Sequence, residues 1–377
     1  MKLFVCKETE ANETRIPLLP ADAGKLVSLG AKLTIETGLG VAIAIDDEAY
    51  EKAGAQIVGD RTAALGQADL VLRMSIPAIA EIQALRGGSI HVSPMDPFIK
   101  RDIVYAFQDQ RVSGVSLEMI PRTTIAQKMD ILSSQANLAG YVAVVLAAER
   151  QAKILPMMMT PAGTIPPARV FVIGAGVAGL QAIATARRLG ARVDAFDVRP
   201  EAQEQILSLG AKPLKVDLGE TGKTKDGYAK QLTDEQLEKQ RQAMAKQCAQ
   251  SDVVITTAKV FGRQAPVIVT NDMLDGMKPG SLVVDLAIET GGNVEATELG
   301  QEIVRNGVTL IGLPELQRHV PVPASQMFSS NLTHFITHFW DKEAKTFTLN
   351  RADEIIQSAL ITHDGEIVNE KILSALS

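Results

Sequence analysis

Cysteine is almost absent from this chain, whose 377 residues include only Cys6 and Cys248. Two thiols cannot supply a metal cluster or a disulfide framework, so we expect no metal site and a reducing compartment. Basic residues are not in excess either, because 38 Lys and Arg stand against 44 Asp and Glu, for a net charge of −6. Nucleic-acid backbones and anionic lipid surfaces attract basic proteins, so neither is expected to be the main partner.

Long apolar runs are also missing. The apolar start, residues 3–6, is too short for the core of a signal peptide and ends at Lys7. The two most apolar stretches, residues 138–148 and 170–186, fall short of the ~18 to 20 uninterrupted residues that a spanning helix needs. We therefore expect a chain that is soluble by itself, with no direct membrane insertion.

The rest of the composition is that of a globular protein, with 46% apolar, 22% charged and 4% aromatic residues. The length favours two domains. Strand patterns alternate with helical patterns of roughly 10 to 15 residues, which predicts βαβ units and parallel sheets. The strands are expected at residues 2–6, 32–36, 70–74 and 89–92, and then at 169–173, 192–196, 212–216, 253–257, 282–286 and 309–313.

Two long helices are expected where the two runs of strands meet, at residues 133–152 and 325–340. A proline-rich break at 157–167 is expected to be the crossing between domains, and two strands are expected in the tail, at 346–349 and 359–362. If both long helices bridge the domains, the C-terminus returns to the first one. The fold class is then α/β, with two Rossmann-like domains with parallel sheets separated by a cleft: residues 1–136 plus 321–377, and residues 137–320.

A glycine-rich turn follows the strand at 169–173 directly. Gly174 permits a tight turn, Gly176 lets the backbone approach a pyrophosphate, and Gly179 lets the next helix pack closely on the strand. Asp197 ends the following strand, where its carboxylate can accept hydrogen bonds from ribose hydroxyls and favours NAD over NADP. Because strand, turn, helix and acid occur in register, we interpret this segment as a dinucleotide site rather than a structural turn, although Arg199 tempers the preference for NAD.

Three loops can complete such a site. The turns at 256–259 and 285–293 follow strand ends, where ligands bind in doubly wound sheets, although ordinary turns would look the same. The long interval at 217–251 begins with three glycines and includes Tyr228. It is either a lid that excludes water from the nucleotide or a solvated insertion, and composition does not decide between them.

A polar stretch precedes the first long helix. If residues from Gln127 onward are helical, Gln127, Asp130, Ser134 and Asn137 share one stripe, with Ser133 at its margin. Such a stripe is either a solvated helix face or a component of a site.

Much of the chain resembles the NAD(H)-binding alpha component of proton-translocating nicotinamide nucleotide transhydrogenase, a relative of alanine dehydrogenase. The resemblance is carried by several short motifs. They are MIPR (119–122), AQ (126–127), MDILSSQ (129–135), NLAGY (137–141), MMMT (157–160), AGT (162–164), PPAR (166–169), LQAIATA (180–186), DLA (285–287) and GGN (291–293).

The resemblance implies an oxidoreductase that transfers hydride from NADH to NADP⁺, the latter held by an NADP(H)-binding partner subunit. It also implies a membrane-embedded proton-channel subunit, a homodimer, and a cytoplasmic location peripheral to the inner face of the membrane. Arg122, Gln127, Asp130 and Ser133 would surround the nicotinamide, and Tyr228 would lie on a mobile loop. The residues expected to bind NAD(H) are Gly174, Gly176, Val177, Ala178, Gly179, Asp197, Val198, Arg199, Thr257, Ala258, Tyr228 and Glu289.

Two other functions stay open. Alanine dehydrogenases use an Arg, a Lys, a His and an Asp; here Arg15 matches the first, but Arg73, Ser93 and Glu289 stand at the other three positions. His91 lies on the same strand face as Ser93, so the alignment of that histidine is not decisive. Departures from the transhydrogenase pattern at 260–262 and 313–321 leave a third interpretation, a divergent NAD(H)-binding module that no longer couples to partners.

Overall fold

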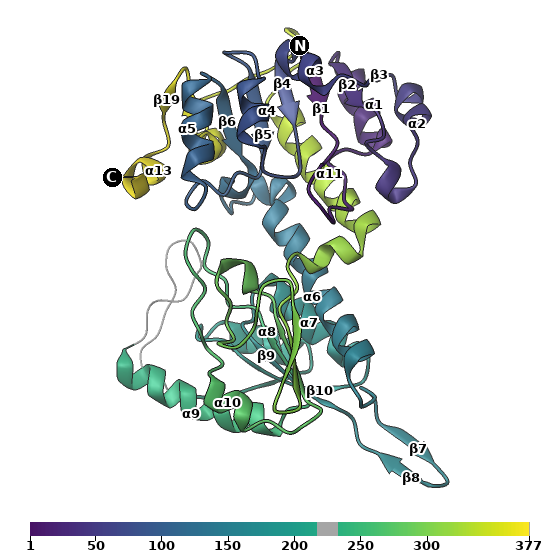
Figure 1. Ribbon diagram of the computed structural model, residues 1–377, viewed down its shortest axis with the longest axis vertical. Helices are drawn as coiled ribbons and strands as arrows, with labels where there is room; N and C mark the ends of the chain where they lie inside the picture. The colour runs from purple at the N-terminus through teal and green to yellow at the C-terminus, as the bar shows by residue number, and fades with distance from the viewer. Residues whose placement is uncertain (217–232, 377) are drawn as a thin grey trace. The chain divides into compact units, whose positions relative to one another are not determined.

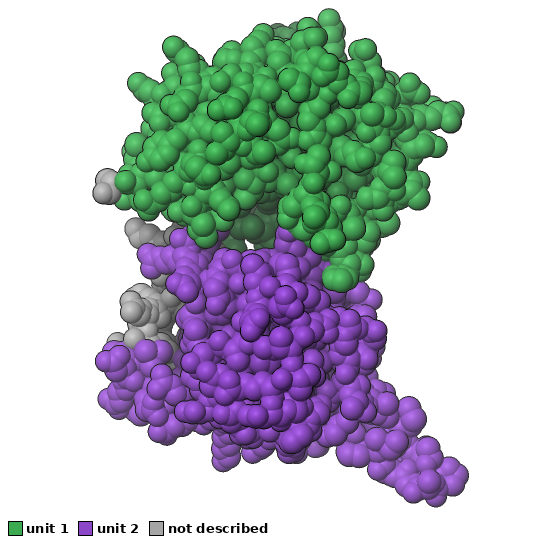
Figure 2. Space-filling view, in the orientation of Figure 1, with its two compact units in different colours: residues 1–135, 318–377 green, residues 136–317 purple. Residues whose placement is uncertain are grey.

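The computed structural model describes residues 1–216 and 233–376. Tyr228 and the glycines of the expected lid lie outside the described residues. The chain divides into two compact units, which are coloured separately in Figure 2. Unit 1 contains Met1–Gln135 and Arg318–Ser377, and unit 2 contains Ala136–Gln317.

Unit 1 is built on a six-stranded parallel sheet in the order β3-β2-β1-β4-β5-β6. The sequence did not predict β3 or β6. The first is a three-residue, partly exposed edge strand, and the second reads Ser-Gly-Val-Ser, residues with little preference for strands. The strands are β1 (Lys2–Val5), β2 (Lys32–Glu36), β3 (Gln56–Val58), β4 (Leu70–Leu72), β5 (Ile90–Ser93) and β6 (Ser113–Ser116).

Short helices connect these strands, and several are capped by aspartate: Asp46 and Asp60 each accept a first-turn N–H, at 3.0 Å. The helical segments that precede α6 in unit 1 are α1 (Pro20–Ser28), η1 (Val41–Ile43), α2 (Asp47–Lys52), α3 (Arg61–Gln67), α4 (Ile79–Gln83), α5 (Arg101–Asp109), η2 (Leu117–Met119) and η3 (Ala126–Met129).

The C-terminal segment completes the core of unit 1. Helix α11 (Pro321–His338) begins at a proline, which suits the first turn of a helix. Its Phe328, Leu332 and Phe335 are buried in one apolar cluster with Leu3 and Val5 of β1. The prediction that α11 bridges the two domains is therefore wrong, because the helix lies wholly in unit 1.

The expected tail strand at 359–362 is also wrong. Asp353 caps the N-terminus of α12 (Glu354–Ala359) at 2.8 Å, so the chain is helical up to Ala359. The remaining tail elements are β16 (Trp340–Asp341), β17 (Thr346–Phe347), β18 (Thr362–His363), β19 (Glu366–Ile367) and α13 (Glu370–Leu376).

Unit 2 contains a seven-stranded sheet in the order β11-β10-β9-β12-β13-β15-β14, parallel except for the edge strand β14. The direction of the chain reverses between β9 and β12, which is the topological switch point of a doubly wound sheet. Two α/β units with Rossmann-like sheets confirm the predicted fold class. The strands are β9 (Arg169–Ile173), β10 (Arg192–Phe196), β11 (Lys212–Pro213), β12 (Val253–Thr256), β13 (Leu282–Asp285), β14 (Glu302–Arg305) and β15 (Val308–Ile311).

The helices of unit 2 include α9, whose Met244 and Cys248 are buried beside Phe171 and Val254 of the sheet. The antiparallel strand β14 was not predicted, because its residues alternate between exposed and half-buried at the sheet edge. The helical segments are α7 (Val177–Arg188), α8 (Ala202–Ser208), α9 (Asp234–Gln250), α10 (Asn271–Asp275), η4 (Ile288–Thr290) and η5 (Leu316–His319), the last of which contains the boundary between the units.

Helix α6 (Ile131–Arg150) passes from unit 1 into unit 2. Its 20 residues have a mean hydropathy of 1.5, so by length and composition it alone among the described helices could cross a membrane. This is weak evidence, since core helices of soluble proteins meet the same criterion. Val142, Ala143 and Val144 are buried, while Tyr141 and Val145 are exposed by 42% and 40%.

The proline-rich break is a β-hairpin of unit 2 and not a crossing between domains. Strands β7 (Met158–Thr160) and β8 (Gly163–Ile165) pair antiparallel, and Gly163 adopts a φ of +136° at the turn. Figure 1 shows this hairpin extending away from the rest of unit 2.

Candidate functional site

The glycine turn of unit 2 is held by contacts that exclude side chains. Gly174 has a φ of +96°, and a Cβ atom built there would lie 2.6 Å from Oγ1 of Thr257. A Cβ on Gly179 would lie 1.9 Å from the carbonyl oxygen of Gly174. Both glycines are therefore needed for the packing of β9, α7 and the β12 loop, whether or not a ligand binds.

Gly176 differs from its two neighbours because a Cβ there would meet no atom within 4 Å. The residue is the N-cap of α7 and is exposed. Val177, Ala178 and Gly179 form the first turn of that helix, whose N–H groups have no acceptor within the helix. An open surface at a helix N-terminus suits a phosphate group, because the N–H groups and the helix dipole both favour negative charge.

Asp197 lies beside this turn, at the end of β10. Its carboxylate accepts hydrogen bonds from the Ala175 backbone N–H at 2.7 Å and from the Arg199 side chain at 2.9 Å. Burial would raise the pKa of Asp197, but the hydrogen bonds from Arg199 and Ala175 outweigh burial, so the pKa is lowered. Asp197 is therefore ionised at neutral pH and partly engaged by Arg199, with Val198 between them in the chain.

The loop after β12 closes the other side of the turn. Thr257 donates its hydroxyl to the carbonyl oxygen of Gly174 at 3.0 Å. The Ala258 N–H donates to the side chain of Asn293 at 2.9 Å, and Asn293 donates back to the Ala258 carbonyl at the same distance. Thr257 and Ala258 therefore lie at the switch point, as the sequence predicts.

Asp285 holds the loop that follows β13. Its side chain is fully buried and accepts hydrogen bonds from Thr256, from Thr297 and from three backbone N–H groups, at 2.8–3.0 Å. Asp285 and Asn293 thus position the loops instead of facing a ligand. The sequence placed these loops near the nucleotide but did not separate the inward-facing residues; the available signal was an acid at a strand end followed by Gly-Gly-Asn.

Glu289 lies on the outer side of the same loop. Its carboxylate pairs with Lys259 and accepts the backbone N–H of Glu315 at 2.6 Å. No contact joins Glu289 to the glycine turn among the described residues.

The polar stretch of unit 1 is not one helix from Gln127 onward. Residues 126–129 form the 3₁₀ turn η3, and Asp130 leaves the helical conformation with φ −74° and ψ 94°. Its carboxylate then caps α6, accepting the Ser133 N–H at 2.9 Å and the Ser133 hydroxyl at 2.6 Å. Because an aspartate side chain competes for backbone N–H groups, it starts a new helix here. The predicted stripe with Ser134 and Asn137 is therefore wrong.

The four residues expected around the nicotinamide still lie within one segment of unit 1. Asp130 and Ser133 are bonded directly, and the Asp130 N–H donates to the Gln127 carbonyl at 3.4 Å. The side chains of Gln127 and Arg122 are exposed or half-buried. The local geometry thus couples Asp130 with Ser133 and leaves Gln127 and Arg122 nearer the surface of unit 1.

The residues compared with alanine dehydrogenase are closed off in unit 1. Arg73 is buried between the carboxylates of Glu8 and Glu81, and Arg15 is paired with Glu13 at 2.6 Å. Burial would lower the pKa of Arg73, but the two carboxylates outweigh it and raise that pKa.

His91 and Ser93 are buried as well. The Ser93 hydroxyl donates to the Pro94 carbonyl at 2.9 Å. The ring of His91 packs against Phe107, with centroids 5.1 Å apart, and neither ring nitrogen has a hydrogen-bond partner among the described residues. Burial, with a smaller effect of Arg73, lowers the pKa of His91 to about 3. A neutral, enclosed imidazole cannot exchange protons with a substrate near neutral pH.

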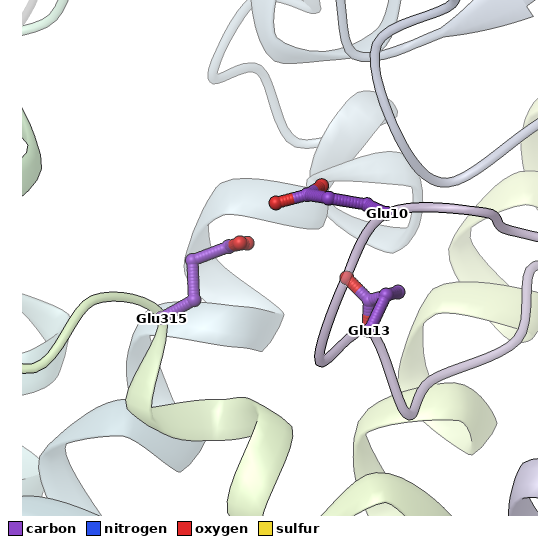
Figure 3. Close-up of side chains that lie close together, drawn as sticks. All are labelled: Glu10, Glu13 and Glu315. Carbon is purple, nitrogen blue, oxygen red and sulfur yellow. The ribbon is translucent and has the colours of Figure 1, made fainter. Parts of the chain in front are cut away.

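Three carboxylates, those of Glu10, Glu13 and Glu315, are drawn in Figure 3. Glu13 is paired with Arg15 and Arg318, and Glu10 with Arg318 at 2.9 Å. Because guanidinium groups already neutralise Glu10 and Glu13, which belong to unit 1 while Glu315 belongs to unit 2, we assign no cation to them.

Comparisons with known proteins agree with this architecture. Residues 4–139 match the family model "Alanine dehydrogenase/PNT, N-terminal domain", and residues 143–370 match "Alanine dehydrogenase/PNT, C-terminal domain". The chain is 42% identical over 376 residues to the first of the chains that make up the NAD(P) transhydrogenase alpha subunit of Rhodospirillum rubrum, covering 98% of both chains. It is 26% identical over 301 residues to alanine dehydrogenase of Bacillus subtilis, covering 79% of this chain and 73% of the relative.

Among solved structures, a transhydrogenase from Sinorhizobium meliloti is similar, with a TM-score of 0.87 and 43% identity, over 98% of this chain and 100% of the other. The resemblance stated from the motifs is confirmed by these comparisons. An oxidoreductase of the transhydrogenase type, with a Rossmann-like nucleotide-binding unit, is thereby supported. The chain belongs to the alanine dehydrogenase/PNT family, as a relative of transhydrogenase alpha subunits.

Proposed function

We propose that this chain is the NAD(H)-binding component of a proton-translocating transhydrogenase. It would transfer hydride directly from NADH to NADP⁺, which is held by a partner subunit. The observation that carries the proposal is the open surface at Gly176, at the N-terminus of α7, with Asp197 at the end of the adjacent strand. The split between NAD(H) here and NADP(H) on the partner rests on that acid, which accepts ribose hydroxyls and repels a 2′-phosphate.

In this proposal, unit 2 holds the nucleotide mainly through its backbone. The N–H groups of Val177, Ala178 and Gly179 would bind the pyrophosphate, and Asp197 would bind the adenosine ribose. Val198, Arg199, Thr257, Ala258 and Glu289 would border the nucleotide, and Tyr228 would close over it.

Unit 1 would orient the nicotinamide. Hydride transfer between two nicotinamides exchanges no proton at carbon, so it requires no general acid or base, only two C4 atoms held ~3 to 3.5 Å apart without water. Arg122, Gln127, Asp130 and Ser133 suit this positional role, because the bonded pair Asp130 and Ser133 can present fixed polar atoms to a carboxamide and a ribose. Proton translocation would belong to the membrane-embedded proton-channel subunit.

We further propose that the chain is a homodimer, cytoplasmic and peripheral to the inner face of the membrane through its partner subunits. The β7–β8 hairpin supports the homodimer: Met157, Met158, Met159 and Ile165 are exposed by 61%, 45%, 73% and 48%. A second copy of the chain would cover this apolar arm and the exposed Tyr141 and Val145 of α6.

Two alternatives make different predictions. An alanine dehydrogenase-like enzyme needs an accessible acid–base group, and the enclosure of His91 argues against it. A divergent NAD(H)-binding module without coupling would bind NADH and transfer no hydride.

The deciding experiment mixes the purified chain with an NADP(H)-binding transhydrogenase component and follows hydride transfer from NADH. The proposal predicts transfer, tight preference for NADH over NADPH, and no alanine-dependent NAD⁺ reduction by the chain alone. Gln127→Ala should reduce transfer much more than NADH binding. NADH binding without transfer would establish the module instead, and brisk alanine oxidation would establish the dehydrogenase.

A further inference from the structure

A pocket of about 400 Å³ lies on unit 1, next to the segment proposed to orient the nicotinamide. One wall comes from residues at and just before η3, and the other from the last turns of α11. All of its lining residues belong to unit 1. They are Thr124, Ile125, Lys128, Met129, His334, Thr337 and His338.

The two walls are tied together below the surface. Asn331, which is 6% exposed, donates its side-chain amide to the carbonyl of Lys128 at 2.8 Å. Met129 is buried, and Ile125 at the rim is 64% exposed. The shape of the pocket is therefore set by packed residues, while its rim offers apolar surface to another molecule.

The charge of the pocket is opposite in sign to that of the whole chain. Of the seven described residues that line it, Lys128, His334 and His338 can carry positive charge and none is acidic. His334 and His338 are four residues apart, so they share one face of α11. A basic, partly apolar pocket on a chain of net charge −6 favours a partner that presents a carboxylate beside an apolar side chain.

We infer that this pocket receives an acidic loop of the NADP(H)-binding subunit during hydride transfer. The inference rests on the proposed function, because Gln127 and Asp130, on the same short segment, are the residues proposed to hold the nicotinamide of NADH. The second nicotinamide must come within ~3.5 Å of the first, so the subunit that carries it must cover the neighbouring surface.

The test reverses the charge of Lys128, which is exposed and whose side chain has no catalytic role in the proposal. Lys128→Glu should weaken binding of the NADP(H) component to the immobilised chain, and raise the concentration of that component for half-maximal transfer, by ~10-fold or more at low salt. Its NADH affinity should not change. Lys342→Glu, the same substitution at another exposed lysine of unit 1, should change binding less than ~2-fold.

The outcomes separate the two proposals because binding and transfer are measured independently. Binding without transfer in the wild type would contradict the proposed function and leave the docking site standing. Equal binding by the Lys128 and Lys342 variants, or none by the wild type, would overturn the docking site. Competition by inorganic phosphate at constant ionic strength would also overturn it, since the pocket would then take a small anion.

Discussion

The two units have sheets of the same order around their switch points but treat those points in opposite ways. In unit 2, β9 and β12 end at a glycine turn whose surface at Gly176 is open. In unit 1, β1 and β4 end at Cys6 and Arg73, both buried. The same topology therefore yields one potential ligand site and one closed core, and the difference lies in the side chains that follow the strands.

The closed switch point of unit 1 is an ionic network. Arg73 lies between Glu8 and Glu81, and Glu81 also pairs with Arg61, which in turn pairs with Glu36 at 2.9 Å. The side chains of Arg73 and Glu8 are each 3% exposed. In such a network each charge depends on its neighbours, because an unpaired buried ion is costly.

The largest effect on stability is expected from Arg73→Ala, which leaves two buried carboxylates without their cation. The free energy of unfolding of unit 1 should fall by about 3 to 5 kcal/mol, as measured by urea unfolding. Arg86→Ala removes a half-exposed pair with Asp69 and should cost less than about 1 kcal/mol. Similar losses for the two variants would show that the network does not hold the switch point closed.

A smaller effect, on binding, is expected from Asp197→Asn in unit 2. Hydrogen bonds to a charged group are worth ~1.5 to 3 kcal/mol, so NADH affinity should fall by roughly 10- to 150-fold. NADPH should be affected much less, because the repulsion of its 2′-phosphate is removed and Arg199 is released. Asp194→Asn, on the same strand and bonded to Gln247, is the matched control for fluorescence titrations with both nucleotides. A parallel loss for NADH and NADPH would contradict this role of Asp197.

The smallest effect is expected from His91→Leu, in the closed unit. The two ring nitrogens lack partners among the described residues, so the substitution should stabilise unit 1 by ~1 to 3 kcal/mol at neutral pH.

The gain should grow as the pH falls. The pKa of His91 is about 3 in the folded chain and has an ordinary value of 6.5, so protons bind the unfolded chain preferentially between these values. Wild-type stability should therefore decline from pH 6.5 toward pH 3 more steeply than that of the variant. His338→Leu, at a histidine on the rim of the pocket, should not change the slope; an unchanged slope for His91→Leu would contradict the enclosure of the ring.

The sequence predicts unit 2 better than unit 1 for a physical reason. The glycine turn depends on local conformation and close approach, which residue type reveals, and Gly174, Gly179, Thr257 and Ala258 lie together as expected. The closure of unit 1 depends on pairing between residues far apart in the sequence. Charged residues such as Glu8 and Arg73 give no local sign that they will be buried.

Two local errors have the same origin. Asp130 fits a helical stripe by spacing, but its carboxylate caps the next helix and breaks the stripe. The segment at 157–167 contains three prolines and reads as a break, yet Gly163 at positive φ closes a hairpin. In both cases hydrogen bonding of a few residues overrides the periodic pattern.

The most direct test of the contrast between the units is NADH binding by Gly176→Ala, measured by calorimetry together with thermal unfolding. A methyl group at Gly176 meets no atom of the protein, so the variant should unfold like the wild type but lose NADH binding, because the methyl group occupies the pyrophosphate position. Gly59→Ala, equally open but in unit 1, should change neither property. Wild-type NADH affinity in Gly176→Ala, or an equal loss in Gly59→Ala, would contradict the assignment of NAD(H) to the open switch point of unit 2.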